Sequence, residues 1–479
     1  MNKKHNHAER IINSNENNHL LLDGLYYPRD HDDIKGKPSL SSEQAAQQLV
    51  RTGLTWNGQD VFHSPVKITF SFPEYSFWGY TPDGTETGLS SFTFTQIQMA
   101  KLSLQAWSDI ANISFTEEIN STRSDITFGN YSLQPDGITP TYSQAYAYLP
   151  GDYFSSGQTW YNYNVNNIQR PDIYEYGRQT LTHEIGHALG LSHPGNYNAG
   201  NGIPTYDKSA SYVQDTRMYS IMSYWSEKYT GADHQGHYSV APLIDDISAI
   251  QYLYGANMNT RTGDTTYGFN SNSERDFFSA SSKDDKLIFS VWDAGGNDTF
   301  DFSGYENNQH IDLNEGSFSD VGGLKGNVSI AYGSNIENAI GGNGNDVIIG
   351  NDLVNILKGG DGNDLLFGGG GYDELYGGLG NDIFLYYSNS ESTRERYDWI
   401  RDFQSGQDKI DISHLNKTLG YENGIYLSET PGDKKGAATI TYDHYHNITD
   451  FFINMGGTVE NDFHVKIVGI VDFATDIIV

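Results

Sequence analysis

The sequence lacks cysteine altogether among its 479 residues. Disulfides, thiolate metal ligands and a cysteine nucleophile are therefore excluded, and any zinc site must be built from His, Asp, Glu or Tyr. Long apolar runs are also missing. No stretch approaches the roughly 18 apolar residues that a membrane-spanning helix needs. The apolar run nearest the N-terminus, Leu20 to Leu22, is too short for the core of a secretory signal peptide.

Basic residues are scarce. The chain has 29 Lys and Arg against 61 Asp and Glu, which gives a formal net charge of -32. Such a balance argues against binding to nucleic acid or to an anionic membrane surface, and we expect neither a nucleic-acid partner nor membrane insertion. It suits a soluble exported protein, or one that holds many cations.

The length predicts two domains, because one hydrophobic core rarely serves so long a chain. Residues 1–19 are polar and are read as a leader or propeptide. Residues 20–255 mix helical and strand patterns, whereas residues 256–479 are rich in Gly, Asn and Asp and show no convincing helical period. The expected elements of the first half are helices near 41–53, 95–111 and 242–255 and strands at 67–72, 113–118 and 125–130.

Five nine-residue units follow one another in register between residues 341 and 385. Each reads as a glycine-rich turn that ends in Asp, followed by a short strand with an apolar middle residue. These apolar residues are Ile348, Leu357, Leu366, Leu375 and Phe384. Stacked aspartates would repel one another without a cation, and Ca²⁺ prefers such oxygen ligands. The alternative, a glycine-rich flexible linker, needs neither fixed register nor a periodic apolar residue.

The repeats resemble the parallel β-roll of the RTX family. The resemblance implies that two units form one turn, so that Asp346 shares an ion with Asp364, and Asp364 with Asp382. Asn355 departs from the pattern and weakens the site expected at Asp373. The resemblance implies several structural Ca²⁺ ions bound by Gly342, Gly344, Asp346, Gly359, Gly360, Asp361, Gly362, Asp364, Gly368, Gly370, Asp373, Gly377, Leu379 and Asp382.

The stretch HEIGHALGLSH begins at residue 183. On a helix, His183 and His187 lie one turn apart on the same face, where both can reach one Zn²⁺, with Glu184 beside them. Gly190 is expected to end the helix, since glycine readily adopts a left-handed conformation there. The turn brings His193 round as a third ligand and leaves a fourth position open, as in catalytic zinc sites. HExxH alone also occurs by chance.

The complete stretch matches HExxHxxGxxH, the extended zinc motif of the metzincins. SIMSYW at 220–225 resembles their Met-turn, with Met222 beneath the metal, and Tyr224 matches the tyrosine of the astacin and serralysin branches. Together with the repeats, these motifs make the chain similar to the serralysins, bacterial secreted zinc endopeptidases. The resemblance extends over nearly the whole chain from about residue 20. The expected fold is an α+β metzincin catalytic domain followed by an all-β C-terminal domain containing a parallel β-roll.

The resemblance implies one catalytic Zn²⁺, held by His183, His187 and His193 and, in the resting enzyme, by Tyr224. Glu184 would act as general base on the attacking water and pass the proton to the departing amine, while Tyr224 swings to the oxyanion. QAYAYLPG at 144–151 resembles the strand that pairs with the substrate backbone, although it reads equally well as ordinary sheet. Broad specificity toward proteins and peptides is expected.

Calcium positions outside the repeats are also implied by the resemblance, although solvated acidic turns are the alternative. They are Arg261, Gly263, Thr265, Asp293, Gly295, Gly296, Asp298, Glu337, Asp402 and Asp408. Calcium outside the cell would fold a domain that stays unfolded in the cytoplasm.

This behaviour would suit export by type I secretion machinery, which needs an unfolded chain. The ending Asp476 to Val479 resembles the corresponding secretion signal or a last buried strand. We expect a secreted monomer, with a small periplasmic inhibitor protein as a partner that the family suggests. The rival interpretation is a calcium-dependent adhesin or binding module with a silent zinc site. An RTX lipase would need a G-x-S-x-G motif, which the sequence lacks.

Overall fold

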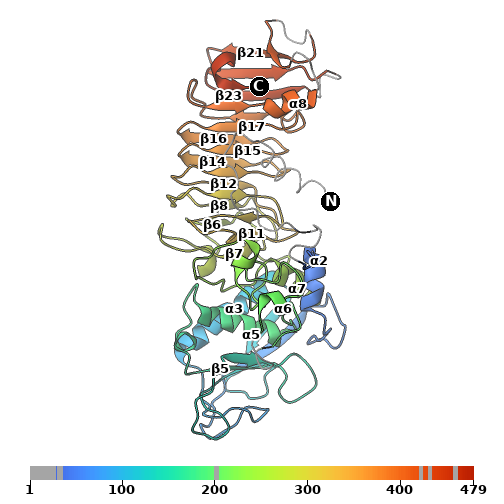
Figure 1. Ribbon diagram of the computed structural model, residues 1–479, viewed down its shortest axis with the longest axis vertical. Helices are drawn as coiled ribbons and strands as arrows, with labels where there is room; N and C mark the ends of the chain where they lie inside the picture. Colours follow the sequence, from blue (N-terminus) through green and yellow to red (C-terminus); the bar gives the residue numbers. More distant parts are fainter. Residues whose placement is uncertain (1–28, 30–35, 199–203, 420–423, 430–433, 457–461) are drawn as a thin grey trace.

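A computed structural model describes residues 29, 36–198, 204–419, 424–429, 434–456 and 462–479. The mixed α and β elements of the first half lie at one end of an elongated molecule, and the strands of the second half are stacked beyond them along its long axis (Figure 1). The expected leader, residues 1–19, falls outside the described residues. Within the described part, no helix is both long and apolar enough to span a bilayer.

The first half contains a five-stranded sheet in the order β2-β1-β3-β5-β4. All neighbouring strands are parallel except β4, which runs antiparallel to β5 at the edge of the sheet. The strands are β1 (Val66–Ser71), β2 (Ile113–Glu117), β3 (Ile126–Tyr131), β4 (Ala145–Ala147) and β5 (Gln158–Asn162). The three strands expected from alternating β-branched residues are therefore confirmed.

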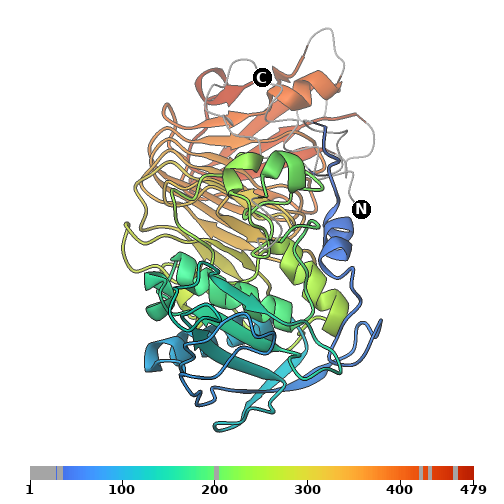
Figure 2. The same cartoon turned by 60° about the horizontal axis from the view of Figure 1, so that its bottom comes forward.

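Helices pack beside this sheet, and the three expected ones are confirmed. Their observed bounds, with those of the shorter helices, are α2 (Ser42–Leu49), α3 (Phe94–Ile110), α4 (Asn166–Gln169), α5 (Tyr176–Ala188), α6 (Tyr206–Ser209), η2 (Glu227–Thr230) and α7 (Ile244–Tyr254). Ser41 and Gln44 form the expected capping box of α2, which satisfies backbone N–H groups that the first helical turn leaves unpaired. Figure 2 shows α2, in blue, beside α7 in yellow-green.

The second half is built almost wholly from short parallel strands. A ten-stranded sheet contains, in order, β20 (Tyr426–Leu427), β21 (Ala437–Asp443), β22 (Ile448–Ile453), β23 (Phe463–Val468), β18 (Asp398–Ile400), β16 (Glu374–Leu379), β14 (Ile356–Asp361), β12 (Asn338–Ile340), β8 (Thr299–Asp301) and β6 (Thr266–Gly268). A six-stranded sheet contains β24 (Ile477–Ile478), β19 (Lys409–Asp411), β17 (Ile383–Leu385), β15 (Leu365–Phe367), β13 (Val347–Ile349) and β9 (His310–Asp312). A small sheet joins β10 (Phe318–Ser319), β11 (Val328–Ile330) and β7 (Phe289–Val291).

The nonapeptides alternate between the two large sheets. Val347 of one unit pairs with Leu365 two units later, and Ile356 pairs with Glu374 in the opposite sheet. Two units therefore form one turn of a parallel β-roll, as expected. The apolar residue at the middle of each unit's strand is fully buried, at 0% exposure for Ile348, Leu357, Leu366, Leu375 and Phe384.

The all-β character expected beyond residue 255 is confirmed, with a few short helical segments between the strands. Short helices occur at α8 (Ser413–Leu419) and α9 (Phe473–Asp476), with a 3-10 turn at η3 (Asp276–Phe278). They lie in irregular sequence too short for a helical period to show. The two halves also share packing, because Trp292 and Ala331 of the second half belong to the core of the first.

Substitution of Gly380 can test how closely consecutive turns of the roll pack against each other. Gly380 has a φ of 148°, and a Cβ there would lie 1.6 Å from the carbonyl oxygen of Gly362. We expect Gly380→Ala to lower the free energy of unfolding by at least about 2 kcal/mol, measured by denaturant melts in saturating calcium. Gly406→Ala is the control, since Gly406 also has a positive φ, 84°, but has nothing within 4 Å of its Cβ position. Equal losses in both variants would contradict the steric argument.

Candidate functional site

The zinc motif occupies the end of helix α5. His183 and His187 are four residues apart on this helix, and their imidazole rings lie 4.8 Å apart between centroids. The chain then turns at Gly190, whose φ is 110°, and a Cβ there would lie 2.3 Å from the carbonyl oxygen of Leu54. Only glycine fits such a position without strain. This turn returns the chain toward the helix and places His193 against the other two histidines.

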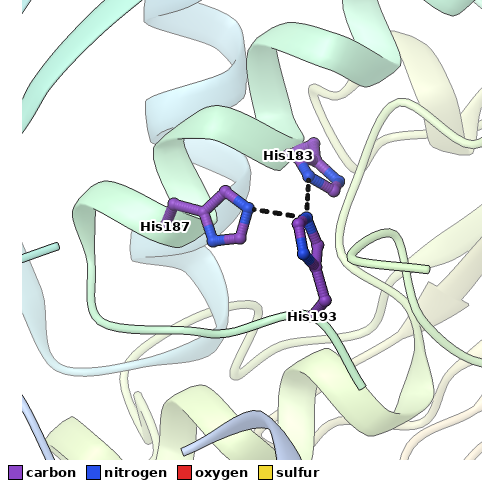
Figure 3. Close-up of side chains that lie close together, drawn as sticks. All are labelled: His183, His187 and His193. Carbon is purple, nitrogen blue, oxygen red and sulfur yellow. Dashed lines mark hydrogen bonds between the residues drawn. The ribbon is translucent and has the colours of Figure 1, made fainter. Parts of the chain in front are cut away.

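The three imidazoles converge through their Nε2 atoms (Figure 3). The Nε2 of His193 lies 3.3 Å from that of His183 and 3.0 Å from that of His187. Nitrogens held about 2.0 to 2.1 Å from one tetrahedral Zn²⁺ lie roughly 3.3 Å apart, so the observed spacing fits that ion. Among the described residues, these three histidines form the one group of three or more His, Asp or Glu side chains that lie close enough together to hold a metal ion.

The other ring nitrogens fix the tautomer of each histidine. Each Nδ1 lies within hydrogen-bond distance of a backbone carbonyl oxygen: 2.9 Å for His183 to Ile221, 2.7 Å for His187 to Leu191 and 3.0 Å for His193 to Tyr197. A carbonyl oxygen only accepts, so each Nδ1 must carry the hydrogen and donate. The Nε2 lone pairs therefore face one another, an arrangement that a shared cation stabilises.

Burial keeps the three rings neutral. Desolvation lowers the pKa of His183 to about 3 and that of His187 to about 4, and it places the pKa of His193 well below its ordinary value. Repulsion between imidazolium charges, were two neighbouring rings protonated together, lowers the pKa of His183 and His193 further. Neutral imidazole is the form that binds metals, so the site is ready for Zn²⁺ at any physiological pH.

Glu184 lies on the same helix between the histidines in sequence. It is 5% exposed, and its Oε2 has no hydrogen-bond partner among the described residues. Burial raises the pKa of Glu184 to about 8. A cation at the three histidines would lower that pKa and favour the carboxylate. The arrangement thus offers a base beside a candidate metal centre.

Tyr224 and Met222 lie on the turn that faces this helix. The ring of Tyr224 is 4.4 Å from that of His193 between centroids, and it stacks near His183 at 6.1 Å. Met222 is fully buried beneath α5. Gly186 makes room for it, because a Cβ at Gly186 would lie 2.6 Å from the Met222 sulfur. The structure therefore brings Tyr224 to the histidines and Met222 under them, where the sequence predicted both.

Several buried residues that sequence reasoning missed hold the ligands in place. Asp246 of α7 accepts hydrogen bonds from the Ile221 backbone N–H at 2.7 Å and from the Ser220 hydroxyl at 2.6 Å. The carbonyl of the same Ile221 orients His183. Asp215 accepts a hydrogen bond at 2.9 Å from the hydroxyl of Tyr197, whose carbonyl orients His193.

A third contact pins the loop that carries the last ligand. The Arg51 guanidinium donates to the carbonyl of His193 and, at 3.1 Å, to that of Gly195. These supporting residues carry no local motif. PLIDDIS showed two acids at a helix start, which reads as ordinary capping, and only the tertiary structure reveals that one of them reaches the Met222 turn.

The strand expected to bind substrate is β4, at the open edge of the five-stranded sheet. It lies beside the zinc helix, and the Gln144 side-chain amide just before it donates to the Thr180 hydroxyl of α5 at 2.9 Å. An edge strand presents unpaired N–H and C=O groups to an extended peptide. The geometry is compatible with substrate pairing, which stays a prediction.

Eight of the ten calcium positions expected outside the repeats lie in the loops that precede β6, β8 and β12, whereas Asp402 and Asp408 follow β18. The Thr265 N–H donates to Asp298 at 2.7 Å, and the Asp298 N–H donates to Glu337 at 2.7 Å. Asp293 accepts from the Gly295 N–H at 2.8 Å, and a Cβ at Gly296 would meet both Asp298 and Gly263 at 2.7 Å. The guanidinium of Arg261 points instead to Asp109, which leaves its backbone carbonyl for a cation.

The aspartates of the roll stack in columns, as the two-unit turn requires. The Asp346 N–H donates to Asp364 at 2.8 Å, and the Asp364 N–H donates to Asp382 at 2.9 Å, with Asp408 continuing the column. The second oxygens of Asp364 and Asp382 are buried without hydrogen-bond partners in the described part of the chain. Unpaired buried carboxylate oxygens are costly, and a Ca²⁺ between turns would offset that cost.

The glycines predicted beside these aspartates line the same turns. Added Cβ atoms at Gly359, Gly368 and Gly377 would fall 2.2, 2.5 and 2.3 Å from the second oxygens of Asp364, Asp373 and Asp382. The Leu379 carbonyl accepts from the Gly362 N–H, and Asp402 accepts from Gly377. The remaining predicted positions, Gly342, Gly344, Gly360, Asp361 and Gly370, belong to the same stacked turns.

The second column, on the other side of the roll, contains one residue that departs from the repeat pattern and one that the sequence analysis did not predict. Asn355 stands where an aspartate was expected, and its N–H donates to Asp373 at 2.8 Å. Asp398, which the sequence analysis missed, continues this column because it accepts the Asp373 N–H at 2.9 Å. No glycine turn precedes Asp398 in the sequence, so the repeat pattern did not reveal it. Near the end, Ile477–Ile478 forms strand β24 against β19.

An α/β domain with an HExxHxxGxxH zinc site over a methionine turn, joined to a parallel β-roll, defines a zinc metalloprotease of the metzincin class. Family models agree: the matrixin model matches residues 75–212, and the model of the C-terminal part of serralysin M10 peptidases matches residues 256–479.

Curated relatives extend this likeness over most of the chain. Serralysin C of Dickeya chrysanthemi is 54% identical over 93% of this chain and 92% of its own. Serralysin A of the same organism is 55% identical over 93% and 92%, and metalloprotease AprA of Pseudomonas entomophila (strain L48) is 51% identical over 92% and 91%. The chain belongs to the serralysin family.

The carboxyls of the roll predict how a calcium-free chain responds to pH. Burial raises the pKa of Asp364 to about 8 and that of Asp373 to about 9, against about 3.9 in an unfolded chain. The folded roll then binds more protons than the unfolded chain, so its stability without calcium should fall as pH rises from about 4 to about 8. Circular dichroism of calcium-stripped protein should show more β structure at pH 5.5 than at pH 8.

Calcium-saturated protein is the control for this pH series. Its carboxylates are ionised in both the folded and the unfolded state above about pH 5.5, so its stability should be nearly flat over the same range. A calcium-free chain with the same flat profile would show that these carboxyls do not limit folding of the roll.

Proposed function

We propose that this metalloprotease is a secreted endopeptidase that hydrolyses peptide bonds in proteins, with Zn²⁺ on His183, His187 and His193 and Glu184 as general base. The observation that carries the proposal is the convergence of three neutral Nε2 atoms beside the buried carboxylate of Glu184, whose Oε2 has no hydrogen-bond partner in the part of the chain that the structure describes. When bound, Zn²⁺ supplies a Lewis acid that polarises the scissile carbonyl and acidifies the attacking water.

The chain's own residues supply the proton transfers. The Glu184 carboxylate accepts the proton of the attacking water, and its burial raises its basicity. The protonated Glu184 then donates to the nitrogen of the departing amine, which restores the carboxylate. Because Glu184 is only 5% exposed, its carboxylate has little access to bulk water, which favours transfer of this proton within the site.

Tyr224 is proposed as the donor to the oxyanion. Its ring lies against His193, and it belongs to a turn rather than to the rigid helix. In the resting enzyme its oxygen would complete the metal site, and during turnover its hydroxyl would donate a hydrogen bond to the negative charge that develops on the carbonyl oxygen. Binding of an extended peptide along β4 would use backbone hydrogen bonds, which favour broad specificity.

The second half is proposed to bind several structural Ca²⁺ ions in the roll and in the cluster around Asp298. This proposal is supported by the second carboxylate oxygens of Asp298, Asp364, Asp373 and Asp382, which are buried and have no hydrogen-bond partner among the described residues. A roll that folds only with calcium would leave the cell unfolded through type I secretion machinery and fold outside. A small periplasmic inhibitor protein is the other proposed partner, and the active species is proposed to be a monomer.

The function is tested by casein hydrolysis with calcium kept saturating while zinc is removed by a chelator and then restored. Activity should vanish and return at one equivalent of zinc. A folded, zinc-loaded protein that cleaves none of several unstructured substrates would instead favour a calcium-dependent binding module with a silent zinc site.

Glu184→Gln tests the assigned base. The amide keeps the shape of the side chain but cannot accept the proton, so kcat/KM should fall about 10² to 10⁴-fold, while bound zinc stays at one equivalent by atomic absorption. Glu43→Gln is the control, because Glu43 is an exposed residue of α2 and its loss should leave turnover unchanged. Parental activity in Glu184→Gln would disprove the mechanism.

Tyr224→Phe tests the assigned oxyanion donor. Loss of one such donor should lower kcat about 10²-fold, a smaller effect than loss of the base, with little change in KM. Peptide hydrolysis at several substrate concentrations separates the two parameters. An unchanged kcat would remove Tyr224 from the reaction and leave it a packing residue.

A further inference from the structure

Arg29 precedes the catalytic helices in sequence but lies against the first turn of helix α7. Its guanidinium forms an ion pair with Asp245 of α7, with side-chain exposures of 11% and 0%. The same guanidinium covers the ring of Tyr219 at 4.7 Å and donates to the carbonyl of Leu40 at 3.2 Å. Arg29 thus contacts both α7 and the segment that leads into the Met222 turn.

Asp245 depends on this arginine. The one other side chain that donates to it in the described structure is the Ser42 hydroxyl, at 3.2 Å, and its second oxygen has no hydrogen-bond partner there. Its backbone N–H donates to the Tyr219 carbonyl at 3.0 Å. A buried carboxylate that loses its cation is strongly destabilising, and here the strain would fall on the first turn of α7.

That first turn is connected to a metal ligand. Asp246, the next residue, holds the N–H of Ile221, and the carbonyl of Ile221 accepts from Nδ1 of His183 at 2.9 Å. Asp246 also accepts from the Leu243 N–H at 2.8 Å. An uncompensated charge on Asp245 would repel its neighbour Asp246 and draw in water or a proton. Either change shifts the carbonyl that orients His183.

We propose that Arg29 is a positioning residue for the zinc site, which neutralises Asp245 and holds α7 against the turn that contains Met222. The inference rests on the zinc endopeptidase activity proposed above. It also sets a limit on maturation: cleavage that removes the leader must leave Arg29 attached to the catalytic domain. Burial raises the pKa of Asp245 to about 6 despite the arginine beside it, which agrees with a carboxylate that needs its cation.

The test uses the full chain in saturating calcium. Arg29→Met removes the charge, Arg29→Lys keeps it, and the double variant Arg29→Met with Asp245→Asn removes both charges. Arg275→Gln is the control for loss of an arginine from a largely buried carboxylate, that of Asp109, with exposures of 15% and 9%. Asp109 keeps its second partner Arg261, and no hydrogen bond or ion pair links Arg275 to the Met222 turn in the described part of the chain. Three quantities are measured: kcat and KM on a peptide, the zinc dissociation constant by chelator competition, and the visible spectrum of the Co²⁺-substituted protein.

Arg29→Met should lose about 10 to 100-fold in kcat or in zinc affinity, as changes to residues behind metal ligands commonly do, with KM within about twofold of the parent. The cobalt spectrum should shift. Arg29→Lys should recover most of the loss, and the double variant should exceed Arg29→Met, because it contains no unpaired buried charge. Arg275→Gln should lower the Tm while leaving zinc affinity and spectrum parental.

Parental kcat, zinc affinity and cobalt spectrum in Arg29→Met would overturn the proposal, even if its Tm falls as in Arg275→Gln, since Arg29 would then be only a structural tie. Failure of Arg29→Lys to improve on Arg29→Met would overturn it as well. If Arg29→Met does not fold, Arg29→Lys and the double variant decide by the same measurements. A parent protein that cleaves no substrate defeats the proposed function alone, because zinc affinity and the cobalt spectrum still test the role of Arg29.

Discussion

The zinc site depends on one constraint: three imidazoles must stay neutral with Nδ1 donating and Nε2 free. Backbone carbonyls of Ile221, Leu191 and Tyr197 meet this constraint for the three histidines. Carbonyls cannot change protonation, so the tautomers are fixed by the fold rather than by pH. Two of these carbonyls are held by acidic side chains, that of Ile221 through Asp246 and that of Tyr197 through Asp215. The surrounding helix and turns therefore act as the outer layer of the metal centre.

The roll holds its buried carboxylates in a similar way to the zinc-site histidines. At Asp364 and Asp382, one carboxylate oxygen accepts from a backbone N–H of the preceding turn, and the other has no hydrogen-bond partner among the described residues. In both halves, the backbone fixes one polar atom of each side chain and leaves the second directed at a common point. Neutral nitrogens in one half suit Zn²⁺, and carboxylate oxygens in the other suit Ca²⁺. The difference between nitrogen and oxygen ligands would therefore direct Zn²⁺ and Ca²⁺ to different halves of a chain that has no cysteine.

The sequence predicted those features that depend on a local repeat or on a local turn. The spacing of His183, His187 and His193, the positive φ of Gly190 and the buried residue of each nonapeptide all follow from periodicity and glycine chemistry. The sequence did not predict contacts between segments that lie far apart along the chain. Asp246 lies at a predicted helix start and Asp398 lies outside the nonapeptides, and the role of each depends on partners far along the chain or in another turn of the roll. Helix α8 was not predicted, because its 7 residues are too few to show a helical period.

The two halves pack against each other at the segment that connects the Met222 turn to α7. The segment between the Met222 turn and α7 contributes Val240 and Ala241 to the core of the second half. Its Asp233 pairs with Lys325 through two backbone hydrogen bonds of 3.0 Å, and Tyr219 meets Phe318 at 5.0 Å between ring centroids. Folding of the second half therefore restrains the segment that leads to Asp246 and, through Ile221, to His183. A cation bound in the roll would therefore also stabilise the hydrogen bond that orients His183, and the proposed calcium and zinc sites would be coupled through this packing.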